Sequence, residues 1–350
     1  MVSVMVSARM TEDYVRSVGR LAYLWGWPLV NMHNRLSIME KLPGPGLLGG
    51  IVPAASPGSA GMLHDYITPE ERLVACPNQD VVYGFGVIDA QRGPSVVQVP
   101  EFGSRFWVYQ VVDQRTDSFV RLGAMYQTRP GLYLLAPASW DGQVPEGIAG
   151  VFRFDTRIAV CIPRVFMDDT DADRAVIQPV INQVMMYPLS QYTGQMHTTD
   201  WTAAPSFPAG GATSGEQETQ WVDPAQFFAE LPAVLAEVPA RSGEEAWYGW
   251  LDSVLQAAAA DPEMAGRLPA AAADANAAWS LTCSNSATSA CRCPATGAPS
   301  ATAPGSAPTT CPGPRWARPT SSSTHPRKPP TSTRTWTITG NCWTGPAPTP

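Results

Sequence analysis

Short runs of alternating apolar and polar residues fill the stretch from Gln79 to Arg164. They read VVYGFGVID, SVVQVP, RFWVYQVVD, GLYLLAP, GVFRF and RIAVCIPR, and Gly, Pro or Asp turns separate them. Alternation with period two is typical of strands whose two faces meet different surroundings. Because the connections are too short for helical crossovers, we expect a compact, mainly antiparallel β-sheet or barrel.

Helical periodicity lies on both sides of this strand-rich stretch. Thr11, followed by two acidic residues, predicts the start of a helix. Pro28 predicts an interruption before a second helical piece that ends near Glu40. The Gly- and Pro-rich run over 42–61 predicts an exposed loop. Further helices are expected over residues 169–187, 224–231, 244–258 and 262–275.

These patterns predict an α+β fold in four segments. Residues 1–61 hold N-terminal helices and a Gly/Pro loop, and residues 62–166 form a β-rich core. Residues 167–280 form a helical segment. Residues 281–350 are expected to be a disordered, out-of-frame tail.

Composition sets the tail apart. From Cys283 to Pro350 there is no Asp, Glu, Leu, Val, Met, Phe or Tyr. Such a stretch cannot bury enough apolar surface to offset its chain entropy. The reading frame can be shifted so that each codon consists of the last base of one printed codon and the first two bases of the next. The shifted translation contains runs such as FRNFG and NIFVN, which resemble ordinary globular protein. We therefore predict a single-base loss near residues 276–282.

Charge and cysteine usage exclude several classes of protein. All 30 acidic residues precede the tail, and the whole chain has a net charge of −7, so nucleic acid is not an expected partner. Cys291 and Cys293 are interpreted as accidents of shifted codons, and no metal site or cofactor is predicted. The sequence is compatible with a homo-oligomer.

The sequence as printed predicts a cytoplasmic protein. No apolar stretch approaches the length of a membrane span, and the first ten residues lack the features of a signal peptide. A misassigned start codon could hide an export signal.

Three stretches concentrate polar groups between apolar ones. In CPNQDVVYG, Asn78 and Asp80 precede the strand that holds Tyr83. Two interpretations stay open. One is an Asx-type turn that starts the strand. The other is a loop that places an amide and a carboxylate at the end of a sheet for ligand binding.

The second stretch is SRFWVYQVVDQRT. Period two places Arg105, Trp107, Tyr109 and Asp113 on one face, which could hold a polar ring compound by stacking and charged hydrogen bonds. The alternative is a solvated outer face with an Arg–Asp ion pair. Gln110 alternates onto the apolar face, where it must find a partner.

The third stretch surrounds the last two strands of the β-rich core. Three arginines there, Arg153, Arg157 and Arg164, could bind an anionic substrate, but pairing with the excess acid is the preferred interpretation. The histidines are scattered. His64 beside Asp65 is the best candidate for a histidine-dependent mechanism, although a surface pair is the commoner arrangement.

Four runs together resemble the bacterial "domain of unknown function 1254" family: AYLWGWPLVNMHNR, CPNQDVVYG, VPEFGSRFWVYQVVDQRTDSF and GLYLLAPASWDGQVPEG. The frame-shifted text of the tail is similar to that family's continuation. The resemblance implies a mixed α/β unit followed by a β-sandwich of a partner family (1214), which this chain would lack. The family more often reads PNxDTLY, so Asn78, Asp80 and Tyr83 match, whereas Val81 and Val82 replace Thr and Leu.

Because the family carries no established reaction, three hypotheses about function follow. The leading one is a protein that binds a small polar ligand, sugar-like or aromatic, through Asn78, Asp80, Tyr83, Arg105, Trp107, Tyr109 and Asp113. The rival is a hydrolase or lyase in which Asp80 or Asp113 is the general base and Arg105 stabilises developing negative charge. The third is a truncated product without function.

Overall fold

The computed structural model describes residues 11–68, 77–208 and 221–290, with side chains up to residue 279. Its helices are α1 (Glu12–Met39), α2 (Asp171–Ile181), α3 (Phe227–Glu237), α4 (Glu245–Ala260) and α5 (Pro262–Ala290). Its strands are β1 (Gly46–Leu48), β2 (Val52–Ala54), β3 (Ala60–Met62), β4 (Val81–Asp89), β5 (Ser95–Val99), β6 (Trp107–Asp113), β7 (Leu122–Gly123), β8 (Gly131–Pro137), β9 (Ile148–Phe154), β10 (Ile158–Phe166), β11 (Met185–Pro188) and β12 (Ser206–Phe207). This order of elements confirms the predicted α+β class.

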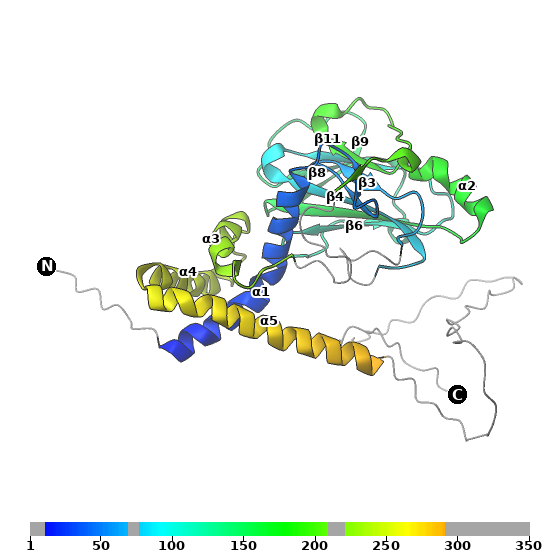
Figure 1. The fold of residues 1–350 in the computed structure, drawn as a ribbon. Coiled ribbons are helices and arrows are strands. Elements are labelled where there is room, and N and C mark those ends of the chain that lie inside the picture. The colour runs from blue at the N-terminus through cyan, green and yellow to red at the C-terminus, as the bar shows by residue number, and fades with distance from the viewer. Residues whose placement is uncertain (1–10, 69–76, 209–220, 291–350) are drawn as a thin grey trace, which may run out of the picture. The chain divides into compact units, whose positions relative to one another are not determined.

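Helix α1 is continuous, although Pro28 predicted an interruption. Thr11 caps it, because its hydroxyl accepts a hydrogen bond from the N–H of Tyr14 at 3.3 Å. A proline inside a helix removes one hydrogen bond and bends the axis. Figure 1 shows that the axis of α1 bends along its length. Burial of Leu29 and Val30 stabilises the helix directly after the proline.

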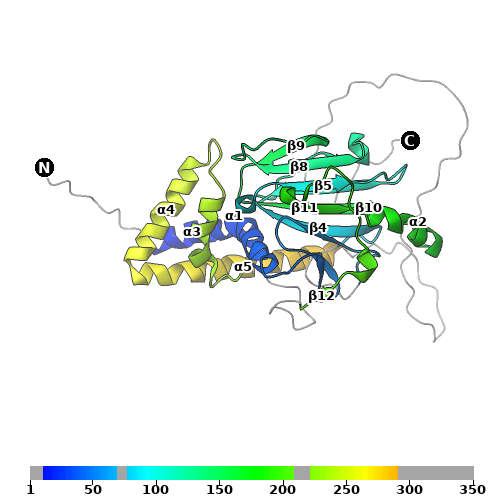
Figure 2. The same ribbon diagram turned by 90° about the horizontal axis from the view of Figure 1, so that it is seen from above.

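The strands form three sheets. The five-stranded sheet has the order β3-β4-β10-β6-β7, the four-stranded sheet β11-β5-β8-β9 and the three-stranded sheet β12-β1-β2. Figure 2 shows β9, β8 and β5 lying alongside one another. Each of the six predicted runs contains a strand, and most neighbours are antiparallel as predicted. Parallel pairing occurs between β8 and β9 and between β1 and β12.

The five-stranded sheet is covered on both faces. Its inner face packs against the four-stranded sheet, where Tyr109 and Cys161 share one cluster with Leu135. Its outer face packs against the C-terminal half of α1 and the three-stranded sheet, where Val160 shares a cluster with Leu36. The inner face is thus the one toward the four-stranded sheet, and the outer face is the one toward α1.

The run over 42–61 is not the exposed loop that its Gly and Pro content predicted. It forms β1, β2 and β3, and Leu48 and Val52 are buried. One glycine in this run allows close contact between strands, because a Cβ on Gly61 would lie 2.6 Å from the carbonyl oxygen of Ala54.

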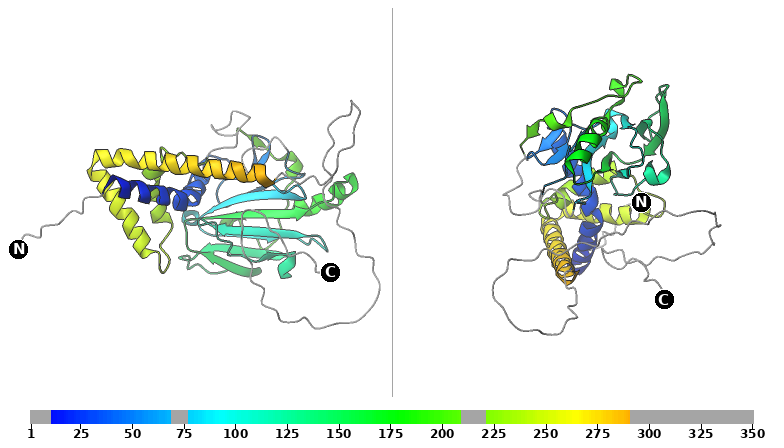
Figure 3. Two further views of the ribbon diagram at one scale, coloured as in Figure 1. Left: turned by 90° about the horizontal axis from the view of Figure 1, so that it is seen from below. Right: turned by 90° about the vertical axis from the view of Figure 1, so that its right-hand side faces the viewer.

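The C-terminal helices pack on the N-terminal half of α1. Figure 3 shows α5 alongside α1. Phe227 of α3 lies in one buried cluster with Tyr23 of α1 and Ala272 of α5. The helices α3, α4 and α5 therefore form a helical layer together with α1.

Several predicted helix boundaries were wrong. The helix predicted over 224–231 is α3, which begins at Phe227 and continues to Glu237. The helix predicted over 169–187 ends at Ile181, since Met186 and Tyr187 pair with β5 as strand β11. Helix α5 continues to Ala290, past the predicted start of the disordered tail. The rest of the predicted disordered tail, residues 291–350, lies outside the described residues. So does Cys76, the first residue of the run CPNQDVVYG. Within the described ranges, no helix has the length and apolar content needed to cross a bilayer.

Candidate functional site

A pocket of about 360 Å³ opens on the outer face of the five-stranded sheet. It lies between that sheet, the C-terminal half of α1 and strand β2. Apolar residues form most of its walls, among them Met32, Val52, Ile67, Phe85, Val112, Val160 and Ile162. Its polar residues are Arg35, Tyr83, Gln110, Thr116 and Arg164. We call it the outer-face pocket.

Three neighbouring strands bring Tyr83, Gln110 and Arg164 together. Arg164 lies opposite Tyr83 in the β4–β10 ladder, and Gln110 lies opposite Ile162 in the β10–β6 ladder. The Nη1 of Arg164 donates to Oε1 of Gln110 at 2.7 Å, and its guanidinium carbon lies 5.5 Å from the centroid of the Tyr83 ring. The result is a row of polar groups on an otherwise apolar wall.

The turn before β4 holds the hydroxyl of Tyr83. The N–H of Asp80 donates to Oδ1 of Asn78 at 2.8 Å, which makes an Asx turn. The N–H of Asn78 donates to the Tyr83 hydroxyl, also at 2.8 Å. Asn78 and Asp80 are exposed, and neither lines the outer-face pocket. The turn interpretation therefore describes these two residues, whereas Tyr83 faces the pocket.

The face of β6 predicted to hold a ligand is the inner one, and that prediction needs correction. Trp107 and Tyr109 lie in the core between the two larger sheets. Tyr109 is fully buried, and its hydroxyl donates to the carbonyl oxygen of Gln98 at 3.0 Å. Period two separates two faces, but it does not say which one lines a pocket when both are covered. The face of β6 that lines the outer-face pocket is the one that carries Gln110.

Arg105 is engaged by Asp173 of α2. Its Nη1 and Nη2 donate to the two carboxylate oxygens at 2.7 and 2.6 Å. The hydrogen bond from Arg105 lowers the pKa of Asp173. Arg105 does not line the outer-face pocket. Its contacts instead fix α2 to the end of the sheet.

Asp113 is buried at the end of β6 and closes the turn that follows. Its Oδ1 accepts hydrogen bonds from the N–H groups of Arg115 and Asp117 at 2.9 and 3.0 Å, and Oδ2 accepts from Arg241 at 3.0 Å. Burial raises the pKa of Asp113, against the opposing effects of the Asp117 N–H and Arg241. Thr116 in this turn has a φ of 68°, and the hydrogen bonds to Asp113 hold that conformation.

The three predicted catalytic groups do not share one site. Asp113 lies opposite Ala159, which in turn lies opposite Ile88 of β4. Asp80 precedes β4 at its other end, so roughly 26 Å of strand separates it from Asp113, at about 3.3 Å per residue. Arg105 likewise precedes β6, at the end opposite to Asp113.

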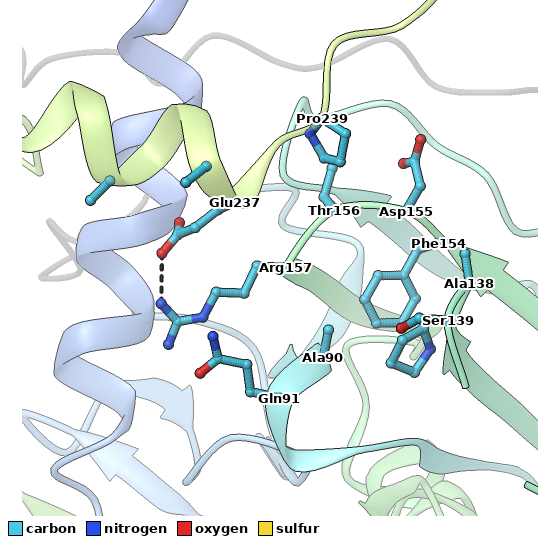
Figure 4. Close-up of a pocket in the computed structure, with 13 residues that line it drawn as sticks. Ala90, Gln91, Ala138, Ser139, Phe154, Asp155, Thr156, Arg157, Glu237 and Pro239 are labelled. Carbon is cyan, nitrogen blue, oxygen red and sulfur yellow. Dashed lines mark hydrogen bonds and ion pairs between the residues drawn. The ribbon is translucent and has the colours of Figure 1, made fainter. Parts of the chain in front are cut away.

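A second, wider pocket of about 770 Å³ lies where the C-terminal end of α3 meets the turn between β9 and β10. Figure 4 shows Arg157 reaching Glu237 in this pocket. Nη1 of Arg157 donates to Glu237 at 2.6 Å, and its Nε donates to Asp89 at 3.3 Å. Glu237 also accepts from His33 at 3.0 Å and from Gln114 at 2.8 Å. These five residues are called the Glu237 cluster below.

The Glu237 cluster joins α1, α3 and the sheets. The Glu237 side chain is only 7% exposed, and each of its oxygens accepts hydrogen bonds. The hydrogen bond with Glu237 raises the pKa of His33 above 6.5, against the effect of burial. Burial raises the pKa of Glu237, but hydrogen bonds from His33 and Gln114 outweigh it and bring the pKa below 4.5. The histidine with a carboxylate partner is therefore His33 rather than the predicted His64.

We expect the contribution of the His33–Glu237 pair to stability to be greatest between about pH 4.5 and 6.5. The part due to His33 is complete below its ordinary pKa of 6.5 and is lost as pH rises through its raised pKa. The part due to Glu237 is present above 4.5 and is lost as pH falls through its lowered pKa.

Denaturant unfolding of the wild type and of His33→Gln, from about pH 4 to 9, measures this effect. The difference in unfolding free energy should peak inside the window and shrink toward high pH. His64→Gln, at an exposed histidine, controls for the removal of a surface histidine. A difference that does not vary with pH would contradict the expectation.

Comparison with known proteins assigns a family to the region that holds Tyr83, Gln110 and Arg164. Residues 57–188 match the model of the family described as "Protein of unknown function (DUF1254)". This segment belongs to the DUF1254 family. The family predicted from the four sequence runs is thereby confirmed, and Tyr83, Gln110 and Arg164 all lie within the DUF1254 segment.

The other comparisons add little to the DUF1254 assignment. No curated protein matches the chain. Among solved structures, the VPA0106 protein from Vibrio parahaemolyticus is 17% identical, with a TM-score of 0.47. The match covers 75% of this chain and 57% of that one, so this chain spans little more than half of that protein's length.

From the sequence, ion pairing is the preferred interpretation for Arg164 over anion binding, and Gln110 is not among the predicted ligand-binding residues. Each had nevertheless left a signal. Gln110 was a polar residue on an apolar face, and Arg164 was an arginine in the last strand of the core. Arg157 pairs with acid as the preferred interpretation expected. Arg164 has no such partner among the described residues, so the two arginines need different explanations.

Proposed function

We propose that this protein binds a small organic ligand in the outer-face pocket. One arrangement supports the proposal: an apolar cavity of about 360 Å³ in which Tyr83, Gln110 and Arg164 converge from three adjacent strands. Ligand sites commonly combine apolar walls with a few oriented polar groups. At about 30 Å³ per water molecule, the cavity has room for roughly 12 waters, which suits a single ring or a short branched chain.

The walls favour an aromatic or branched ligand over a sugar-like one. A sugar carries several hydroxyl groups, and each needs a hydrogen-bond partner when it is buried. The row of Tyr83, Gln110 and Arg164 lies at one part of the wall, and Arg35 and Thr116 are the other polar residues of the lining. Apolar residues such as Phe85 and Ile162 form most of the remaining wall. An apolar ligand body with one polar end matches this distribution.

The hydrolase or lyase hypothesis has less support. Asp113 lies at the end of β6 opposite to Arg105, and Arg105 is already bound by both carboxylate oxygens of Asp173. A general base and a positive group that stabilises charge must both reach the reacting atoms. The Asp113–Arg105 pair does not meet that requirement, because its two groups lie at opposite ends of β6. For Asp80 and Arg105, which precede β4 and β6 at the same end of the sheet, the opposing observation is the contact between Arg105 and Asp173.

Ile162→Trp is expected to abolish ligand binding, because the indole would fill the outer-face pocket that Ile162 lines. Binding is measured on the full chain as the rise in melting temperature with small aromatic and branched acids, amides, alcohols and sugars. A compound at 100 times its Kd stabilises the folded state by about 2.7 kcal/mol. Val176→Trp on α2, where the side chain is 68% exposed, is the matched control.

Two outcomes would contradict the proposal. One is that no compound raises the melting temperature of the wild type. The other is that a compound raises it equally in Ile162→Trp.

We also propose that residues 281–350 are frameshifted text, as their composition predicts. Resequencing the gene across codons 270–290 tests this directly. An intact reading frame in that interval would refute it.

A further inference from the structure

The outer-face pocket has two arginines among the described residues that line it. Arg35 and Arg164 line it, and none of the described residues that line it is Asp or Glu. The chain as a whole carries a net charge of −7. An arginine without a carboxylate partner in such a lining attracts anions, and the contacts of Arg164 decide whether it is one.

Arg164 differs in its contacts from Arg105, Arg115 and Arg157. Arg105, Arg115 and Arg157 each pair with a carboxylate. Arg164 has no carboxylate within ion-pair distance in the described part of the chain, and its hydrogen bond goes from Nη1 to Gln110. A guanidinium has five N–H donors, so the edge formed by Nε and Nη2 is left for another acceptor. Two oxygens of one carboxylate fit such an edge.

Neighbouring residues hold Arg164 in place for this contact. Gln110 accepts from Nη1 at 2.7 Å and itself donates from Nε2 to Ser118 at 3.4 Å. The ring of Tyr83 lies beside the guanidinium, with its centroid 5.5 Å from the central carbon. Gln110 is thus a positioning residue, since it acts on the ligand through Arg164.

The rest of the pocket decides what kind of anion fits. A phosphate has more oxygens than the polar row can satisfy, and apolar walls would leave some of them without partners. A carboxylate needs only one charged partner and can carry an apolar body. Phe85, Val112 and Ile162 line the space that such a body would occupy.

From these observations we infer that the ligand is a small monocarboxylate with an aromatic or branched apolar body, and that Arg164 binds its carboxylate. The inference deepens the proposed function and rests on it.

Matched acids and amides test the inference. Benzoate is compared with benzamide, and 3-methylbutanoate with 3-methylbutanamide, by calorimetric titration of the full chain; inorganic phosphate is a third arm. We expect at least one acid to bind about 10-fold or more tightly than its amide, because only the acid forms a charged pair with Arg164. Arg164→Gln should weaken that acid by about 10-fold or more and leave the amide within about 2-fold. Arg153→Gln, at an arginine that bonds backbone oxygens away from the pocket, is the control.

A second variant tests the site without removing the arginine. Gln110→Glu has nearly the same shape and places a carboxylate where Arg164 already donates. It should compete with the ligand and remove acid binding while the variant remains folded. Gln256→Glu, at an exposed glutamine of α4, controls for the added charge.

The outcomes separate the inference from the proposed function. Equal affinity for acid and amide, or an unchanged acid affinity in Arg164→Gln, overturns the inference. So does phosphate that binds as tightly as the acids. If only neutral compounds bind and Ile162→Trp blocks them, the proposed function stands and the inference fails. If nothing binds in a manner sensitive to Ile162→Trp, both fail.

Discussion

Replacing Glu237 with Ala is expected to lower the free energy of unfolding by about 3–5 kcal/mol, the range for breaking a buried ion pair. The side chain is only 7% exposed, and it accepts hydrogen bonds from Arg157, His33 and Gln114. Without the carboxylate, the Gln114 amide loses its 2.8 Å acceptor, and the Arg157 guanidinium keeps its hydrogen bond to Asp89 but loses the one to Glu237. The loss should be large because three elements meet at this one group.

The chain offers a matched control for this effect. Glu263 and Arg267 form a pair at the same 2.6 Å separation, but Glu263 is 78% exposed. Glu263→Ala should therefore cost no more than about 0.5 kcal/mol, as for exposed pairs along a helix. Chemical denaturation near pH 6, inside the window where the His33–Glu237 pair contributes, measures both variants. Equal losses in the two would show that burial does not strengthen the Glu237 cluster.

Phe227→Ala is expected to lower the unfolding free energy by about 3–5 kcal/mol, since it leaves a cavity in the helical layer. Phe227 is fully buried at the start of α3. Its ring makes edge-to-face contacts with Tyr23 at 4.9 Å and with Phe228 at 5.0 Å between centroids. Gly26 of α1 admits the ring, because a Cβ there would lie 2.9 Å from it.

Two further variants define what the Phe227 experiment means. Val176→Ala removes an apolar side chain that is 68% exposed, and it should change stability by less than about 0.5 kcal/mol. Gly26→Ala should destabilise the wild type, and part of that loss should disappear when Phe227 is replaced by Ala in the same chain. Strictly additive losses would contradict the contact between α1 and the ring.

Local pattern predicted the strands of this fold well. The run VVYGFGVID is β4 from its first residue to its last, and GLYLLAP is β8. Alternation and turn residues are properties of neighbours in sequence, so they survive without tertiary information. The predicted break at Pro28 failed, because packing on both sides of the proline holds one bent helix together.

Contacts between distant residues were not predictable in the same way. Tyr83 was predicted as a ligand residue and lines the pocket, whereas Trp107 and Tyr109 were assigned to the wrong environment. Both faces of β6 are covered, so alternation alone could not rank them. Arg105 found its partner in α2, and His33 found Glu237 in α3. These pairs join residues that are far apart in the sequence. Which distant residues meet depends on the topology of the chain, and the local spacing of residues does not reveal it.

Helix α1 belongs to two hydrophobic interiors at once. Its first half contributes Tyr23 to the cluster with α3 and α5, and its second half contributes Leu36 to the layer on the outer face. The same second half supplies Met32 and Arg35 to the rim of the pocket. A change in the packing of the C-terminal helices would thus move α1 and, with it, part of the wall of the outer-face pocket.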